Sequence, residues 1–201
     1  WSSDVCSSDL NVHFQEPKFN KSGSNYIRLT YDEVEEDLNT LVFMSYTSSS
    51  FRFCLDKLME NLLGIKLSHS RRFINSVSSF EAFNKVYKNQ KNTKCSNYLE
   101  TNKENLLLIS KNKVDDFKEF SSKLIRSRDY HVHSNLKNKN IYSDFELLYI
   151  SFLLDYAVGL GIMQEMKVSK KIIQKVVMQG QSVFIDMQRT NKILSQDFLK
   201  S

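Results

Sequence analysis

Arg128 and His133, which enclose the stretch Arg-Asp-Tyr-His-Val-His, are the two residues whose types and spacing most directly suggest chemistry. An arginine is a fixed cation whose guanidinium can bind a phosphate through two parallel hydrogen bonds. A histidine can take up or release a proton near neutral pH. Few residue pairs can cut RNA without a metal ion, and this is one of them. The pair can be predicted to cleave RNA only if both side chains face one cleft.

The element that carries the pair is expected to be a helix beginning near residue 114. Apolar residues recur along it at steps of three and four: Val114, Phe117, Phe120 and Leu124. One more step of four reaches Arg128, which should therefore point toward the core or a cleft. His133 lies about 140° further round if the helix continues. We therefore expect either that the helix ends near Tyr130 or that two copies of the site meet across a two-fold axis.

A second pair has the same spacing, since Arg126 and His131 are also five residues apart. Spacing alone is thus a weak signal. The alternative to a catalytic pair is an arginine bonded to nearby carboxylates and a histidine at the end of a helix. Both interpretations remain open at this point.

The rest of the chain reads as helices. With one proline and five glycines in 201 residues, it has too few turn residues for a β-sandwich or barrel. Helical periods or apolar runs predict helices from residue 31, within 41–63, and over 71–87, 98–109, 114–130, 144–160, 169–178 and 183–194. Gly64, Gly159, Gly161 and Gly180 are expected to end or separate them, with loops at 88–96 and 134–140. The predicted fold is an all-α bundle of about five to seven helices.

Three parts of the chain differ in composition. Residues 1–10 have no apolar period, carry four serines and resemble adapter-derived sequence, although a native flexible terminus is the alternative. Residues 11–30 look like a linker or the remnant of an upstream domain, which is expected because the chain begins with Trp1. Residues 31–201 are assigned to the helical domain.

Charge and cysteine content limit the classes of partner and site. The formal net charge of +5 becomes +7 once Asp4 and Asp9 are set aside, which mildly favours an anionic partner. Cys54 and Cys95 have no CxxC spacing, so they predict reduced thiols in a cytoplasmic protein and neither a metal site nor a disulfide framework. We expect no cofactor. No signal peptide and no apolar run long enough to span a bilayer is recognised.

The stretch from Arg128 to His133 resembles the signature of the HEPN superfamily, which is arginine, a polar residue, three variable residues and histidine. Asp129 fills the polar position; in the competing register that position is Ser127, a poorer fit. More narrowly, the chain is similar to the ApeA-type HEPN domain of bacterial anti-phage proteins. Tyr130 matches an aromatic residue of that family. Two further segments resemble it, a leucine- and glutamate-containing helix near 55–60 and an apolar helix from 145 that ends in Leu-Gly-Ile at 160–162.

This resemblance implies a HEPN-like helical bundle and a metal-independent endoribonuclease whose 2′-hydroxyl attack leaves a 2′,3′-cyclic phosphate. His133 would transfer a proton, Arg128 would stabilise the extra negative charge on the phosphate, and Asp129 would orient one of the two. The resemblance also implies a homodimer, RNA as substrate, no membrane association, an upstream sensor domain and a toxic role in abortive infection. Tyr130, His131 and Arg126 are candidates for supporting the site or contacting RNA.

Asp129 is a departure, since asparagine is usual there. The acid could pair with Arg128 and weaken its hold on phosphate, or it could favour the charged form of a nearby histidine. Two non-catalytic alternatives follow. One is a HEPN-like module that binds nucleotides or proteins and dimerises. The other is a plain interaction domain in which Arg128 pairs with Asp129 or Glu119.

Overall fold

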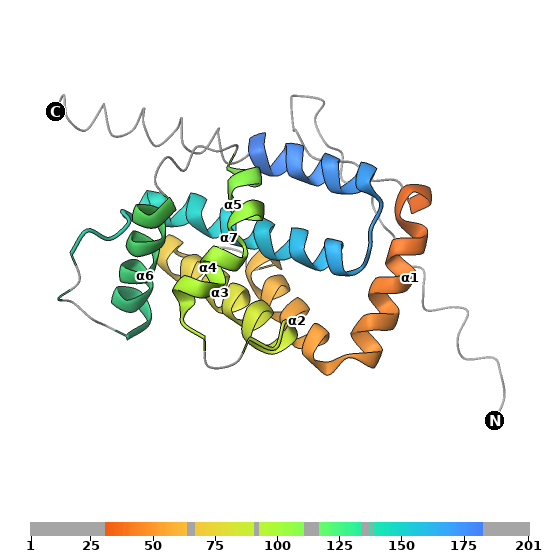
Figure 1. Cartoon of the computed structure of the whole chain (residues 1–201), viewed down its shortest axis with the longest axis horizontal. Helices are drawn as coiled ribbons and strands as arrows, with labels where there is room; N and C mark the ends of the chain where they lie inside the picture. The colour runs from red at the N-terminus through yellow and green to blue at the C-terminus, as the bar shows by residue number, and fades with distance from the viewer. Residues whose placement is uncertain are drawn as a thin grey trace.

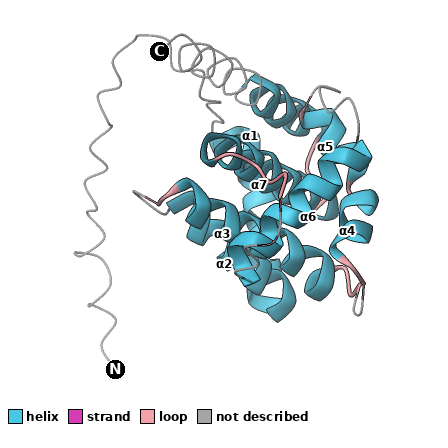
Figure 2. Cartoon of the chain, turned by 90° about the vertical axis from the view of Figure 1, so that its left-hand side faces the viewer, coloured by secondary structure: helices cyan, strands magenta, loops and turns pink. Residues whose placement is uncertain are grey.

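The protein is described from a computed structural model that covers residues 31–63, 67–90, 93–110, 117–133, 137 and 139–182. Within these residues the regular structure is entirely helical (Figures 1 and 2), so the all-α class is confirmed. The elements are α1 (Tyr31–Thr47), α2 (Ser49–Leu63), α3 (His69–Ala82), the π-helical turn η1 (Phe83–Tyr87), α4 (Cys95–Thr101), α5 (Lys103–Ile109), α6 (Phe117–His133) and α7 (Asp144–Glu165). Residues 170–182 are also helical. The described part alone therefore contains more helical elements than the five to seven expected.

Helix α7 is the centre of the bundle, and α3 packs along it more extensively than any other described element. Its start is fixed by a capping box, in which the Ser143 side chain accepts from the Glu146 amide and the Glu146 carboxylate accepts from the Ser143 amide. Twelve of its residues are buried, and they cover all of the helix surface except one stripe that is half-buried. α1 and α6 lie at opposite ends of the assembly (Figure 1), so α6 reaches solvent on its outer side.

The core is built from large apolar side chains that α2, α3, η1, α4, α5 and α6 direct toward α7. Its most completely buried members are Phe51, Phe73, Phe80, Phe83, Leu99, Leu106, Ile109, Leu124, Leu147, Ile150, Leu153 and Leu154. Each such side chain stabilises the fold by about 1.5–3 kcal/mol relative to an exposed position. The helical periods read from the sequence therefore mark the surfaces that the fold buries.

Two expected helices are each divided in two, which the apolar pattern did not indicate. The segment 41–63 breaks before Ser49, where the hydroxyl of Ser48 accepts from the amide of Phe51 at 3.2 Å. The segment 98–109 breaks at Asn102, a buried side chain that donates to Asn84 Oδ1 at 2.7 Å. Helix α4 also begins at Cys95, inside the expected loop 88–96. Polar side chains, rather than proline or glycine, set these breaks.

The glycines expected to stop helices do not stop them. α7 passes through Gly159 and Gly161 to Glu165, and the helical residues 170–182 pass through Gly180. A Cβ at Gly161 would lie 2.7 Å from Cζ of Phe83, so this glycine admits the ring of η1 against α7. Gly180 similarly lies against the ring of Tyr156. The expected boundaries at Gly64 and near 114, and the helix 183–194, lie outside the described residues, as do 1–10 and 11–30.

α7 is longer and more apolar than the sequence analysis allowed. Among the described residues it is the one helix that could cross a membrane by length and composition alone. However, 61% of its most apolar window is buried inside the bundle, as expected for a central packing helix. This is weak grounds for membrane insertion, and the absence of membrane association remains a prediction.

One acidic side chain lies within this core. Asp155 of α7 is 4% exposed, and its Oδ2 accepts from Asn61 Nδ2 at 2.7 Å. The same amide also lies 2.6 Å from the hydroxyl of Ser76. Burial raises the pKa of Asp155 to about 7, although the hydrogen bonds of Ser76 and Asn61 and the charge of Arg72 act in the opposite direction. The carboxyl group is therefore held near the point of losing its proton at neutral pH.

The two glycines of α7 provide a matched test of the packing against Phe83. Gly161→Ala should lower the free energy of unfolding by about 1–3 kcal/mol, because the methyl group displaces a buried ring. Gly159→Ala meets nothing within 4 Å and should be neutral or stabilise by up to about 1 kcal/mol. Urea unfolding followed by circular dichroism measures both. Equal effects would contradict the assigned contact.

The buried carboxyl of Asp155 should make stability depend on pH. Its pKa in the folded protein, about 7, lies above the ordinary value of 3.8, so between these pH values the folded state binds more protons than the unfolded state. Stability contributed by this group is thus lost as pH rises from about 4 to about 7, on the order of a few kcal/mol. Asp155→Asn should remove this loss, as measured by urea unfolding at a series of pH values. Asp56→Asn, at an exposed site on α2, is the control and should keep it.

Candidate functional site

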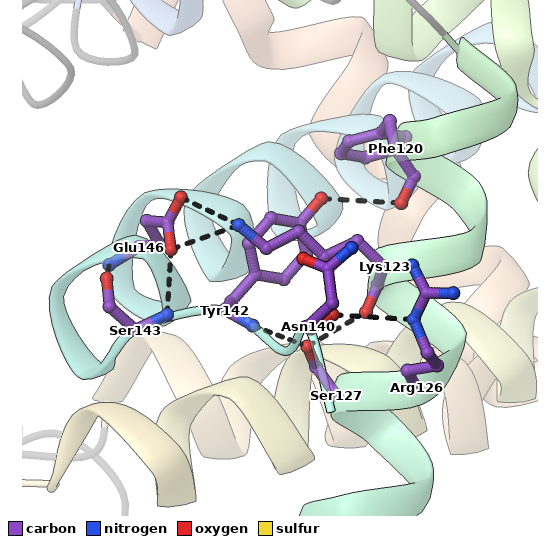
Figure 3. Close-up of polar contacts among 8 residues, drawn as sticks. All are labelled: Phe120, Lys123, Arg126, Ser127, Asn140, Tyr142, Ser143 and Glu146. Atoms are coloured by element: carbon purple, nitrogen blue, oxygen red, sulfur yellow. Dashed lines mark hydrogen bonds and ion pairs between the residues drawn. The ribbon is translucent and has the colours of Figure 1, made fainter. Parts of the chain in front are cut away.

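Helix α6 presents both candidate residues, and its buried face fixes its position. Phe120 and Leu124 of α6 are buried, as the apolar period predicts, and Ser127, which that period does not include, is buried as well. The Ser127 hydroxyl donates to the carbonyl of Lys123 and accepts the amide N–H of Tyr142, both at 2.8 Å (Figure 3). This hydroxyl therefore joins α6 to the segment that leads into α7.

Further polar contacts between α6 and this segment are drawn in Figure 3. The ammonium of Lys123 forms an ion pair with Glu146, at 3.1 Å from Oε1. Arg126 donates from Nε to the carbonyl of Asn140 at 3.4 Å. The phenol of Tyr142 donates to the carbonyl of Phe120 at 3.3 Å. One side of α6 is thus devoted to holding the chain before α7, and Arg126 belongs to that side.

Arg128 and His133 are in contact on the same helix. Nη1 of Arg128 lies 2.8 Å from Nε2 of His133. Helix α6 continues to His133, so the expectation that it ends near Tyr130, or that a second copy is needed to bring the pair together, is wrong. The angle of about 140° separates the two Cα positions around the helix axis. The side chain of Arg128 is long enough to extend along the helix surface to His133 in spite of this angle.

This contact sets the direction of the hydrogen bond. A guanidinium has only donors, so Nη1 of Arg128 donates and Nε2 of His133 accepts. His133 is exposed. Its Nε2 is the atom that could accept a proton from a substrate once the bond to Arg128 is exchanged.

Two carboxylates also bind the Arg128 guanidinium. Glu81 of α3 lies 2.9 Å from Nη2, and Asp129 lies 3.0 Å from Nη1. Asp129 therefore pairs with Arg128, which is the first of the two possibilities that the sequence left open. Glu81 was not identified from the sequence. It is distant along the chain, and no local spacing links it to α6; only the packing of α3 against α6 brings the two together.

The acids stabilise the charge of Arg128. Burial acts to lower the pKa of the guanidinium, but its hydrogen bond to Asp129 and the charge of Glu81 raise the pKa above the ordinary value. The side chain is 23% exposed. Its Nε is buried and has no hydrogen-bond partner among the described residues. Arg128 is therefore a permanent cation that still has an unused donor.

The competing pair is not brought together in the same way. His131 lies edge-on to the ring of Phe73, with centroids 6.1 Å apart, and edge-on to Tyr130 at 4.9 Å. Burial lowers the pKa of His131, and the charge of Asp144 offsets only part of this. The contacts of Arg126, described above, are on the side of Asn140. The spacing in the sequence could not distinguish the pair Arg128–His133 from the pair Arg126–His131, but the packing of these side chains distinguishes them.

A pocket of about 440 Å³ opens beside Arg128. It lies between the end of α3 with η1, the start of α4, and α6. Its lining combines charged, polar and apolar groups: Glu81, Lys85, Thr93, Lys94, Cys95, Ser96, Tyr98, Ile125, Arg128 and Asp129. Burial, followed by the charge of Glu81, raises the pKa of the Cys95 thiol to about 12, which makes it a poor nucleophile. Arg128 thus lines this pocket and also contacts His133, which is not part of the lining.

No cluster of three or more histidine, cysteine or acidic residues able to hold a metal ion occurs within the part of the chain that the structure covers. Comparison with protein-family models, curated proteins and solved structures gave no match. The HEPN resemblance therefore remains a prediction from the sequence.

Proposed function

We propose that the chain is a metal-independent endoribonuclease domain of HEPN type that cuts RNA through attack of the 2′-hydroxyl. The observation that carries the proposal is the 2.8 Å contact between Arg128 Nη1 and His133 Nε2, with Arg128 also lining a pocket. A guanidinium cation and an imidazole nitrogen lie side by side there. These are the two groups that such a reaction requires, one for charge and one for the proton.

The reaction assigns one step to each group. Nε2 of His133 takes the proton from the 2′-hydroxyl, and the 2′-oxygen forms a bond to the adjacent phosphorus. The phosphorus becomes five-coordinate, and its added negative charge is stabilised by the Arg128 guanidinium. The bond from phosphorus to the 5′-oxygen then breaks, and that oxygen takes a proton from solvent. The products are a 2′,3′-cyclic phosphate and a free 5′-hydroxyl.

RNA binding must rearrange the contacts of Arg128. In the free protein Nη1 donates to both Asp129 and His133, so Nε2 of the histidine is occupied. A phosphate that takes over donors of the guanidinium would release Nε2 for the 2′-hydroxyl. The unpartnered Nε is a further donor that a phosphate oxygen can satisfy, and leaving a buried donor unpaired costs about 1–3 kcal/mol. The site is thus arranged to gain from an incoming anion.

The biological setting is taken from the resemblance. We infer a cytoplasmic toxic effector of an anti-phage abortive-infection protein, acting as a homodimer and controlled by an upstream sensor domain. Because Arg128 and His133 already meet within one chain, dimerisation is not needed to bring this pair together. A second chain would instead add a second pair to the site.

A second candidate is a non-catalytic HEPN-like module that binds nucleotides or proteins. One observation favours it: Glu81 and Asp129 both neutralise Arg128, at 2.9 and 3.0 Å. A guanidinium held by two carboxylates binds an external phosphate less well than a free one. Under this interpretation the ion pairs of Arg128 with Glu81 and Asp129 stabilise the packing of α3 against α6, and His133 transfers no proton.

Cleavage of single-stranded RNA in EDTA tests the proposed reaction. His133→Ala and Arg128→Ala should each lower the rate by about a hundredfold or more, because they remove the proton acceptor and the charge. His131→Ala and Arg126→Ala are matched controls on the same helix and should retain most of the activity, with folding checked by circular dichroism. Equal cleavage by the wild type and His133→Ala would sink the assignment.

Glu81→Gln separates the two candidates. In a site that must exchange Glu81 for a phosphate, removing this charge should raise RNA affinity by about fivefold. The measurement is fluorescence anisotropy of a labelled RNA in a His133→Ala background, which prevents cleavage. Glu60→Gln, at an exposed position on α2, is the control for net charge. An unchanged affinity together with lower stability would favour the non-catalytic module.

A further inference from the structure

The pocket beside Arg128 has charges that the Arg128–His133 pair does not use. Lys85 of η1 and Lys94, immediately before α4, line it, and both are exposed. Its volume of about 440 Å³ is of the size that small-molecule sites have, which is about 300–1,000 Å³. The pocket can therefore hold a group the size of one nucleotide next to the proposed point of cleavage.

The charges on the pocket wall favour an anion. Its two acids, Glu81 and Asp129, are both in ion pairs with Arg128, at 2.9 and 3.0 Å. The raised pKa of Cys95 leaves that thiol uncharged at neutral pH. Two carboxylates on one guanidinium leave one negative charge, and the ammonium groups of Lys85 and Lys94 bring the formal charge of the wall to +1. A phosphate entering the pocket meets net positive potential.

The wall also has an apolar part. Ile125 of α6 is half-buried, and the ring of Tyr98 is buried, with its hydroxyl donating to the carbonyl of Gln90 at 3.0 Å. Tyr98 is part of the core and offers little surface, so Ile125 is the apolar side chain of this wall against which a base can pack. The pocket thus combines an apolar wall with cations at its rim.

Resting on the proposed endoribonuclease function, we propose that this pocket binds the nucleotide next to the scissile phosphate, with Lys85 and Lys94 holding that nucleotide's own phosphate. Arg128 belongs to the pocket lining, and its Nη1 contacts His133. An RNA strand whose scissile phosphate lies on Arg128 thus has one neighbouring nucleotide at the pocket. Lys85 and Lys94 are substrate-positioning residues. They, rather than His133, should determine the affinity for RNA.

Two measurements on the whole chain test this. The first is calorimetric titration with each of the four nucleoside 3′,5′-bisphosphates, which carry one phosphate for Arg128 and one for the lysines. The second is the KM and kcat of RNA cleavage. Lys85→Ala/Lys94→Ala should weaken binding of at least one bisphosphate by about tenfold and raise KM similarly, with kcat nearly unchanged. Lys57→Ala/Lys170→Ala removes the same charge away from the pocket and is the control.

The outcomes separate this inference from the proposed function. Lysine-dependent bisphosphate binding without RNA cleavage would support the pocket and overturn the nuclease. Cleavage with an unchanged KM in the Lys85/Lys94 variant would overturn the pocket and leave the nuclease standing. Equal losses in the Lys85/Lys94 and Lys57/Lys170 variants would also overturn the pocket, because they would indicate general electrostatic attraction. Absence of both binding and cleavage would overturn both.

Discussion

The burial of α7 is the constraint on which the other elements depend. This helix is apolar on nearly all sides, so it is stable in water only when other helices cover it. α3 covers it most extensively, and the missing side chain of Gly161 lets Phe83 approach closely. α6 is then joined to the start of α7 by the hydrogen bond between Ser127 and the amide of Tyr142. The positions of α3 and α6 follow from their attachment to one central helix.

The polar site is a consequence of that arrangement. α3 and α6 pack against one another, and their facing surfaces include an acid, Glu81, and a base, Arg128. A half-buried arginine requires an anionic partner, and Glu81 supplies one that comes from a different helix. Asp129 supplies the other locally. The guanidinium is therefore held in place by the fold, and its Nη1 also donates to His133.

Elements with a strong local pattern could be predicted from the sequence. The stripe through Leu124 predicted that Arg128 points toward the core or a cleft, and this side chain is half-buried and lines a pocket. The apolar run from 145 correctly marked a helix that is buried on most of its surface. Features that depend on contacts between distant residues could not be predicted. Glu81 has no local signal, and Gly161 reads as a helix stop unless Phe83 is known to lie against it. Asn102, which breaks a helix through a bond to Asn84, belongs to the same group.

The contact between Arg128 and His133 also shows why helical angles alone mislead for long side chains. Two residues five positions apart on a helix differ by about 140° around its axis, so short side chains at these positions do not meet. Yet the reach of a guanidinium is comparable to the helix radius, and its Nη1 arrives at Nε2 of the histidine while Nη2 still reaches Glu81. The planar fork of arginine makes this possible, since its donors point in several directions at once. A lysine at position 128 could not hold Glu81, Asp129 and His133 in one fixed plane, so the residue type is as important to this site as the spacing.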